Sequence, residues 1–326
     1  MLKTWTTALT ALIASSAAAM AAPVTVTLGH VLTEESSYAA AAQTFKEELE
    51  NSGEFSVQVF PRGQLGGELK MLQAAGVGAV DVVITGAAPL ENTVPEISLL
   101  SLPYLFDNLD QATDILRGPV GDSFLAKLDP AGLKGLGFVS AIERNVLTSN
   151  KKVETVDDMQ GLKIRVIQGP AFVETYAALG AQPTPMAYSE LYLAVQSGVV
   201  DGAEASPDTM ISDRFVEVSK YYTLSRAQYM PAVMVMSGRK YDSLTEAQKA
   251  IVDAAAVKAS EAGFGYYAAS YGTSLAKMQE EGVEVVEVDT APFAEKARTA
   301  WPNLMASVPN AQENVDMIEQ AKSHAN

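Results

Sequence analysis

The 326-residue sequence contains no cysteine and only two histidines, His30 and His324. The absence of cysteine excludes disulfides, thiolate zinc sites and a cysteine nucleophile. Neither an H-E-x-x-H nor a G-x-S-x-G motif occurs, and the glycine pairs at 76–78 and 135–137 lack the rest of a nucleotide-binding loop. A lone histidine such as His30, at the end of a predicted strand, is more often a structural or pocket-lining group than a general base. The sequence therefore gives catalysis little support.

Positive charge is also scarce, with 23 Lys and Arg against 39 Asp and Glu and a formal net charge of −16. A nucleic acid or an anionic membrane surface requires a basic partner face, so neither is expected. The chain is 48% hydrophobic and long enough for one large or two medium domains with buried cores. We therefore expect a soluble globular protein.

Only one apolar segment is prominent, residues 1–22, which read MLKTWTTALTALIASSAAAMAA. A positive charge at Lys3, an apolar centre and small residues at the end are the layout of a secretory signal peptide. The run is too short for a membrane anchor and is interrupted by threonines and serines. Its removal would change the net charge from −16 to −16 − 1 = −17, because Lys3 is lost. We expect an exported protein without direct membrane insertion.

Strand and helix patterns alternate in two series. The first predicts strands at 24–29, 55–60 and 81–86 and helices at 33–52 and 68–75, followed by helices near 110–128 and a strand at 136–141. The second predicts strands at 162–167, 181–184 and 199–205, helices at 170–179 and 189–196, and a returning strand at 232–237. Such alternation predicts an α/β fold with two sheets joined by more than one crossing.

A long helix is predicted after the second series. Ser243 and Glu246 have the S-x-x-E spacing of a capping box, and helical residues continue to about Met278 without proline. Three glycines between 263 and 272 weaken this helix and predict a kink. At about 1.5 Å per residue the helix is long enough to brace two lobes. A strand at 283–288 and a helical tail with Trp301 complete the chain.

Two arginines stand at structurally informative positions in this acidic chain. Arg165 ends the predicted strand GLKIRV, with Gln168 just beyond it, where parallel sheets place ligand sites. Arg144 lies in AIERNVLTSN, which crosses between the two series. A planar guanidinium matches the two oxygens of a carboxylate. The alternative is that each arginine forms an ordinary ion pair with one of the 39 acidic residues.

Several longer motifs resemble one protein family. They are FPRGQLGGELKMLQAAGVGAVDVV, SLPYLFDN, TSNKKVETVDDMQGLKIRV after Arg144, and LGAQPTPMAYSELYLAVQSGVVDGAE. In this order and spacing they are similar to the substrate-binding proteins of TRAP (tripartite ATP-independent periplasmic) transporters. The resemblance implies a two-lobed α/β periplasmic binding protein fold with a ligand cleft between the lobes. The lobes would comprise residues 23–142 with 231–270 and residues 143–230 with 271–326.

The resemblance implies a function as well. The protein would capture a small carboxylate in the periplasm by hinge closure and deliver it to the membrane subunits of a TRAP permease. The alternatives are a secreted enzyme that acts on a small acid through His30, and a sensory binding module without transport. The resemblance implies neither a cofactor nor a catalytic residue, and nothing in the chain marks a metal site.

Ligand-binding roles also follow from the resemblance. Arg165 would form the principal salt bridge to the ligand carboxylate, and Arg144 would assist it. Tyr188 would pack against the ligand, and Gln168 matches a further contact position. The full set of candidate ligand-binding residues is Arg165, Arg144, Tyr188, Gln168, Glu204, Ser206 and His30.

The sequence departs from many relatives at two positions. Where relatives read V-D-G-x-E-N, this chain has Ala205, so the asparagine's polar contact is expected to be lost or moved to Ser206 or Asp208. Gly86 stands where some relatives have a glutamate. Together the two changes predict a pocket that is roomier or more apolar than a sugar-acid site. Tyr188 and the missing asparagine predict a less hydroxylated acid.

Overall fold

A single mixed sheet forms the centre of the molecule. This computed structural model describes residues 22–324, so the predicted signal peptide lies outside the described residues except for Ala22. The strand order is β2-β1-β3-β8-β4-β7-β5-β6, with β9 paired to β8. The strands are β1 (Val24–Gly29), β2 (Phe55–Phe60), β3 (Val82–Gly86), β4 (Leu133–Thr148), β5 (Lys163–Val166), β6 (Gln182–Pro185), β7 (Gly202–Ala205), β8 (Tyr221–Ser237) and β9 (Glu284–Val286).

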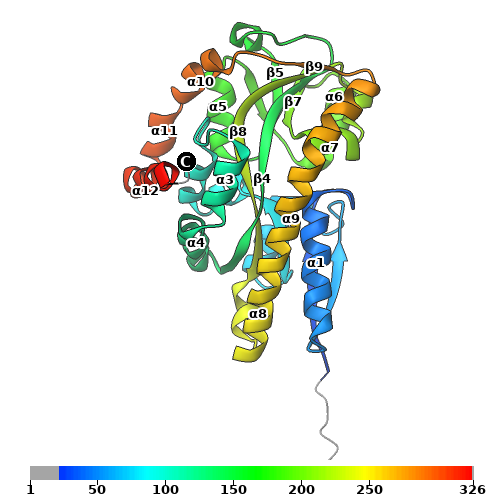
Figure 1. The fold of residues 1–326 in the computed structure, drawn as a ribbon, viewed down its shortest axis with the longest axis vertical. Coiled ribbons are helices and arrows are strands. Elements are labelled where there is room, and N and C mark those ends of the chain that lie inside the picture. Colours follow the sequence, from blue (N-terminus) through cyan, green and yellow to red (C-terminus); the bar gives the residue numbers. More distant parts are fainter. Residues whose placement is uncertain (1–21, 325–326) are drawn as a thin grey trace, which may run out of the picture.

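Two long strands join the two halves of this sheet (Figure 1). In one half β1 pairs in parallel with β2 and β3, and in the other β5 pairs in parallel with β6 and β7. β4 and β8, of 16 and 17 residues, pair antiparallel and run through both halves. The prediction of two separate sheets is therefore wrong, because the strands predicted at 136–141 and 232–237 extend far enough to link the halves by hydrogen bonds.

The β4–β8 ladder is irregular where it passes between the halves. Its register shifts between Arg144 and Val146, so that residues 224–227 of β8 lie opposite Asn145. Arg226 has a φ of 48°, and its N–H donates to Asn145 Oδ1 over 2.8 Å. The Asn145 side chain thus replaces ladder hydrogen bonds, and a bulge of this kind bends a strand. The bend lies next to Arg144.

Helices surround the sheet. The α-helices are α1 (Ser37–Asn51), α2 (Glu68–Gly76), α3 (Leu109–Leu116), α4 (Pro119–Leu125), α5 (Pro170–Ala178), α6 (Leu191–Gln196), α7 (Pro207–Ser212), α8 (Gly238–Asp242), α9 (Glu246–Glu280), α10 (Thr290–Arg298), α11 (Trp301–Ala306) and α12 (Ala311–His324). Short 3-10 helices include η1 (Ala88–Asn92), η2 (Pro95–Ser101), η5 (Tyr188–Glu190) and η6 (Phe215–Glu217).

The long helix α9 lies along both halves of the molecule (Figure 1), packed against α1, β4 and α7. This confirms the predicted bracing helix. The Thr245 hydroxyl accepts the N–H of Gln248 over 3.3 Å, and Gln248 Oε1 accepts the N–H of Thr245 over 3.1 Å. The capping box predicted at Ser243 is therefore wrong by two residues, since the Ser243 hydroxyl donates instead to the carbonyl of Lys240.

One glycine of α9, Gly263, has a packing role. The helix runs unbroken from Glu246 to Glu280. A Cβ added at Gly263 would lie 2.3 Å from the carbonyl oxygen of Val139 in β4, whereas one added at Gly265 would meet nothing within 4 Å. Gly263 therefore lets the helix lie directly on β4, where the sequence pattern had predicted only a weak point.

The hydrophobic core fills both halves. One large cluster of buried apolar side chains extends from Val26 and Phe45 in one half to Ile164 and Phe172 in the other. A smaller cluster surrounds β7 and α6. Despite the length of α9, none of the helices within residues 22–324 is both long and apolar enough to cross a membrane.

Candidate ligand-binding site

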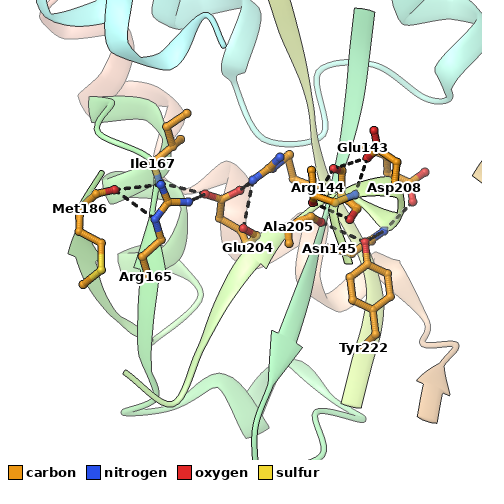
Figure 2. Close-up of polar contacts among 12 residues, drawn as sticks. Glu143, Arg144, Asn145, Arg165, Ile167, Met186, Glu204, Ala205, Asp208 and Tyr222 are labelled. Carbon is orange, nitrogen blue, oxygen red and sulfur yellow. Dashed lines mark hydrogen bonds and ion pairs between the residues drawn. The ribbon is translucent and has the colours of Figure 1, made fainter. Parts of the chain in front are cut away.

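Three neighbouring strands bring Arg144, Arg165 and Glu204 together (Figure 2). β7, which carries Glu204, lies between β4 with Arg144 and β5 with Arg165. Figure 2 shows the Glu204 side chain between the two guanidinium groups. The exposed fractions of these residues are only 6% for Arg144, 1% for Arg165 and 0% for Glu204. The site is therefore closed to bulk water.

Glu204 holds both arginines. Nε and Nη2 of Arg144 contact its Oε2, and Nη2 also donates to the Glu204 carbonyl over 3.0 Å. Nη1 of Arg165 lies 3.3 Å from Glu204 Oε1, which also accepts the N–H of Ile167 over 2.9 Å. A buried carboxylate with this many donors is strongly held in place.

The other edge of Arg165 faces the chain that follows β6. Its Nε and Nη2 donate to the carbonyl of Met186 over 3.1 and 2.9 Å. The Tyr188 ring centroid lies 5.9 Å from Arg165 Cζ, within the range of a cation–π contact. The resemblance implied only that Tyr188 would pack against the ligand, and the structure adds a backbone acceptor at Met186 that fixes the plane of the Arg165 guanidinium.

Each arginine keeps N–H groups for which no residue within 22–324 provides an acceptor. A guanidinium has five N–H donors. Arg165 uses one each on Nε, Nη2 and Nη1, which leaves one N–H on each terminal nitrogen. Arg144 uses Nε and Nη2 on Glu204 and leaves both N–H groups of Nη1. These remaining donors, all on cationic groups, can receive an anionic ligand.

Burial and charge act in opposite directions on the two arginines. Burial favours the neutral guanidine and is the largest single effect at Arg144, but the charge and the hydrogen bond of Glu204, with smaller contributions from Tyr176 and Tyr222, together outweigh it and raise the pKa of Arg144. At Arg165 burial dominates and Arg144 repels, so its pKa is lowered despite Glu204. Arginine nevertheless stays protonated in proteins. The two arginines and Glu204 together carry one excess positive charge while Glu204 is ionised.

Two further buried acids, Glu68 and Asp208, lie near the arginines. Glu68, on the first turn of α2, accepts the N–H of Gly86 over 2.9 Å and the Thr85 hydroxyl over 3.2 Å, both through Oε1. Burial raises its pKa, and the charges of Arg165 and Arg144 oppose the shift. Burial likewise raises the pKa of Asp208, with Arg144 opposing it.

Sequence analysis missed Glu68, although it stands within the motif FPRGQLGGELK that carried the family resemblance. Glu68 lies near the arginines only because α2, in one half of the molecule, approaches the other half. No local pattern around residue 68 reports that approach. A Cβ added at Gly67, directly before Glu68, would lie 3.8 Å from Ala187 Cβ, so the start of α2 does approach the chain that follows β6.

The two sequence departures have structural consequences. The carbonyl of Ala205 accepts the Tyr222 hydroxyl over 3.0 Å, so the backbone at this position is satisfied. Ser206 is buried and donates to Asp208 Oδ1 over 2.5 Å. Beside Gly86, an added Cβ would lie 2.9 Å from Met230 Cε, so the site there is apolar and filled. The prediction of a roomier pocket is wrong at Gly86, because the Met230 side chain occupies the space beside it.

A cavity of about 220 Å³ opens between the two halves next to this site. It includes Tyr188, whose ring also contacts Phe215 edge to face with centroids 6.0 Å apart. Its lining comes from both halves: Val31, Arg62, Gly63, Gly66 and Gly67 on one, and Tyr188, Ser189, Tyr192, Asp213 and Phe215 on the other. Of the candidate ligand-binding residues only Tyr188 lines this cavity, and the same ring lies over Arg165.

Gln168 and Glu91 lie at another contact between the halves. The carbonyl of Gln168 accepts the side-chain amide of Asn92 over 2.9 Å. Glu91 is buried, and its Oε2 accepts the N–H of Ala171 at the start of α5 over 3.0 Å. Burial raises the pKa of Glu91 to about 7. Sequence analysis did not single out Glu91, because a lone acidic residue carries no local signal of burial.

His30 is a ring neighbour of Tyr38. It follows β1, is buried, and packs edge to face on Tyr38 with ring centroids 6.4 Å apart. Burial lowers its pKa to about 4, although Glu34 opposes the shift, so the imidazole is neutral near pH 7. No contact joins it to either arginine. Within residues 22–324, no group of three or more His, Asp or Glu side chains is placed to hold a metal.

A pair of buried arginines with unused donors, beside a cleft between two lobes, defines a binding protein for a small anion. Residues 28–307 match the bacterial extracellular solute-binding protein family 7. The chain belongs to this family. The match covers both halves of the sheet and every candidate site residue.

Individual relatives agree with this assignment. A solute-binding protein of Roseobacter denitrificans is 33% identical over 289 residues, covering 88% of each chain. The C4-dicarboxylate-binding periplasmic protein DctP of Rhodobacter capsulatus is 29% identical and covers 91% of this chain and 88% of its own. The crystal structure of a TRAP periplasmic solute-binding protein from Polaromonas, bound to D-erythronate, superposes with a TM-score of 0.87. It is 31% identical and covers 90% of this chain and 98% of its own. The predicted two-lobed fold is therefore confirmed.

Proposed function

We propose that this protein binds the carboxylate of a small organic acid through Arg165 and Arg144 and closes its lobes around it. One observation carries the proposal: both guanidinium groups are buried beside the cleft, are fixed by Glu204, and still have N–H donors to spare. Preorganised donors of this kind lower the cost of binding, because they need no reordering when the ligand arrives. The family to which the chain belongs supports the same conclusion.

Closure supplies the rest of the binding energy in this proposal. Removing water strengthens the charge-assisted bonds, although desolvation of the ligand offsets part of the gain. The bulge at Asn145 lies next to Arg144 and supports a hinge at this point. The lobe boundaries, residues 23–142 with 231–270 and residues 143–230 with 271–326, stay a prediction. Ligand contact at Arg144 would act directly on the bend.

The proposed role is delivery, with the TRAP permease membrane subunits as the partner and the periplasm as the location. The related Polaromonas structure, named as a TRAP periplasmic protein, supports both. The alternative of a secreted enzyme requires a general base near the ligand. Burial lowers the pKa of His30 to about 4, which makes it a weak base, and no hydrogen bond joins it to the arginines, so we propose that the site only binds.

The proposed ligand carries hydroxyl groups as well as a carboxylate. The relative from Polaromonas holds D-erythronate, a trihydroxy acid. In this chain Glu68 lies near the arginines and has both its hydrogen bonds on Oε1. Its second oxygen suits a ligand hydroxyl donor. This differs from the less hydroxylated acid expected from Ala205, because the sequence analysis did not include Glu68.

The test is a thermal melt of the mature protein against small organic acids, each paired with its neutral primary amide. A ligand that binds only the folded state must raise the melting temperature. We expect at least one hydroxy acid to raise it and the matching amide to have no effect. Equal shifts for an acid and its amide, or no shift with any acid, would contradict carboxylate recognition by the arginines.

A further inference from the structure

The cavity of about 220 Å³ between the two halves has one cationic and one anionic side chain among its lining residues, Arg62 and Asp213. Different halves contribute them, because Arg62 follows β2 and Asp213 follows α7, which comes after β7. In the sheet, the strands β1, β3, β8 and β4 lie between β2 and β7, so no sheet hydrogen bond brings the two residues together. They face one cavity only because the two lobes approach each other.

Arg62 has an unusual backbone conformation. Its φ is 55°, in the left-handed region that residues other than glycine rarely adopt. The N–H of Arg62 donates to the carbonyl of Leu32 over 3.0 Å, and the N–H of Gly63 donates to the carbonyl of His30 over 2.9 Å. These bonds fix the turn to the chain that follows β1. A strained residue that is held so firmly is typical of a functional position, which directs attention to the Arg62 side chain.

The Arg62 side chain is only lightly engaged. Its Nε donates to Glu34 Oε2 over 2.9 Å within the same half, and 60% and 63% of the two side chains are accessible. Such an exposed pair is weak. A guanidinium has five N–H donors, and the other four of Arg62 have no acceptor within residues 22–324. Arg62 can therefore bind a second carboxylate at little cost.

Asp213 provides a carboxylate on the other wall. It is half-buried, and its Oδ2 accepts the Ser212 hydroxyl over 3.0 Å. The next residue, Arg214, has a φ of 61°, so this wall also ends in a strained turn. Burial is the largest effect on Asp213 and raises its pKa, whereas the opposite charge of Arg62 favours the ionised form and lowers the pKa. An ionised Asp213 is thus a suitable partner for Arg62.

The cavity adjoins the proposed ligand site at one residue. Tyr188 is part of the cavity lining, and its ring centroid lies 5.9 Å from Arg165 Cζ. The Tyr188 ring is therefore a wall that the cavity and the arginine site share. Contacts that hold the two sides of the cavity together also hold this wall in place.

We propose that Arg62 and Asp213 form a latch between the lobes: they pair across the cavity when the lobes close and so slow the release of the ligand. The latch rests on the proposed function, since it requires a bound acid and lobes that move. Opposite charges on approaching surfaces favour the closed form, whereas water separates and screens them in the open form. Any contact made only in the closed form raises the apparent affinity of a ligand that binds this form. Both residues act through closure and need no contact with the ligand.

Removing either charge is the first test. The probes are D-erythronate, D-gluconate and D-glucuronate, and the one that raises the melting temperature most is used throughout. We expect Arg62→Gln and Asp213→Asn each to weaken its binding by about three- to fivefold, because a partly exposed ion pair contributes modestly. The double variant should lose no more than either single variant, since each substitution alone abolishes the pair. Calorimetry measures the affinity, and displacement kinetics should show a dissociation rate raised by a similar factor.

Exchanging the charges is the second test. Arg62→Glu and Asp213→Lys each place like charges on facing walls, and each should weaken binding by about tenfold or more. The double variant restores opposite charges and should bind within about threefold of the unmodified protein. At 1 M salt, where screening extends over only about 3 Å, the differences between these variants should shrink. A merely structural role of either residue would produce neither the rescue nor the salt dependence.

Two control variants come from neighbouring charges. Arg214 lies next to Asp213 in a similar backbone conformation, but it pairs with Glu217 in its own half. Arg214→Gln should change affinity by less than about twofold. Glu34→Gln removes the present partner of Arg62 and should leave the affinity unchanged or raise it, because Arg62 is then free for Asp213.

The outcomes separate the latch from the proposed function. Unchanged affinity in both neutral variants, or additive losses without rescue by the exchanged charges, would overturn the latch and leave acid binding intact. A loss in Glu34→Gln as large as that in Arg62→Gln would assign Arg62 to its own half and also overturn the latch. Absence of binding by every acid would overturn the proposed function and the latch with it. If Asp213→Lys fails to fold, the neutral variants and their double variant still decide.

Discussion

Replacing Arg165 tests the site most directly. Arg165→Ala removes the two N–H bonds to the Met186 carbonyl, the contact with Glu204 and the two donors left for the ligand. Truncating one partner of a buried charged pair costs on the order of 2 to 5 kcal/mol. At about 1.4 kcal/mol per decade, ligand affinity should fall by roughly 30-fold to several thousandfold.

Arg165→Lys tests geometry separately from charge. A lysine ammonium has three donors on one nitrogen and cannot bond the Met186 carbonyl side-on while presenting a parallel pair to the ligand. We therefore expect a loss of at least about tenfold in affinity, even though the positive charge is kept. Arg117→Lys is the matched control, because Arg117 forms an exposed pair with Glu261 and does not line the cavity beside Tyr188, and its effect should stay within about twofold.

The assay for these variants is calorimetric titration with an acid that raises the melting temperature of the unmodified protein. Melting of the ligand-free variants is measured alongside it, because Arg165 also holds the chain at Met186 and its loss affects folding. Unchanged affinity in both Arg165→Ala and Arg165→Lys would refute the assignment of Arg165. A loss in Arg117→Lys as large as that in Arg165→Lys would show that the planar fork at Arg165 does not govern binding.

Two predictions concern stability. Gly263→Ala should destabilise the protein by roughly 1 to 3 kcal/mol, because its Cβ would lie 2.3 Å from the Val139 carbonyl oxygen. Gly265→Ala should stabilise it by about 0.5 to 1 kcal/mol, because its Cβ would meet nothing within 4 Å and alanine favours the helix. Chemical denaturation measures both free energies of unfolding, and equal effects of the two substitutions would contradict the packing role of Gly263. Glu91 has a folded pKa of about 7, above its ordinary value of 4.5, so the folded state binds the extra proton between these values and stability falls as pH rises through them. Between pH 5 and pH 8 the free energy of unfolding of the unmodified protein should fall by an amount on the order of 3 kcal/mol because of Glu91, and Glu91→Gln should remove this fall. Parallel profiles of unfolding free energy against pH for the two proteins would contradict this.

Local sequence patterns predicted most of the elements. The strand at 55–60 is observed with the same bounds, and the alternation that predicted it reflects one face buried against α1. The boundary errors have a physical cause. The strands at 136–141 and 232–237 were predicted too short, since their extensions carry polar residues such as Glu143 and Gln228, which read as loop but are buried and hydrogen-bonded.

The candidate site was predicted in part. Arg165 and Arg144 could be selected from sequence, because a strand end and a family motif mark them, and the structure brings them to one carboxylate. Their shared partner could not be assigned, since Arg144 and Glu204 lie 60 positions apart in the chain. Only the register of β4 against β7 places them together.

The sequence by itself determined the class of protein: acidic, without cysteine, α/β, and built on motifs of one family. It did so because periodicity, composition and motifs are local properties that survive without knowledge of contacts. The tertiary structure decided which charges meet. Burial of Arg144, Arg165 and Glu204 in one place removes the water that would otherwise screen them, and this turns three separate residues into a site with a defined charge.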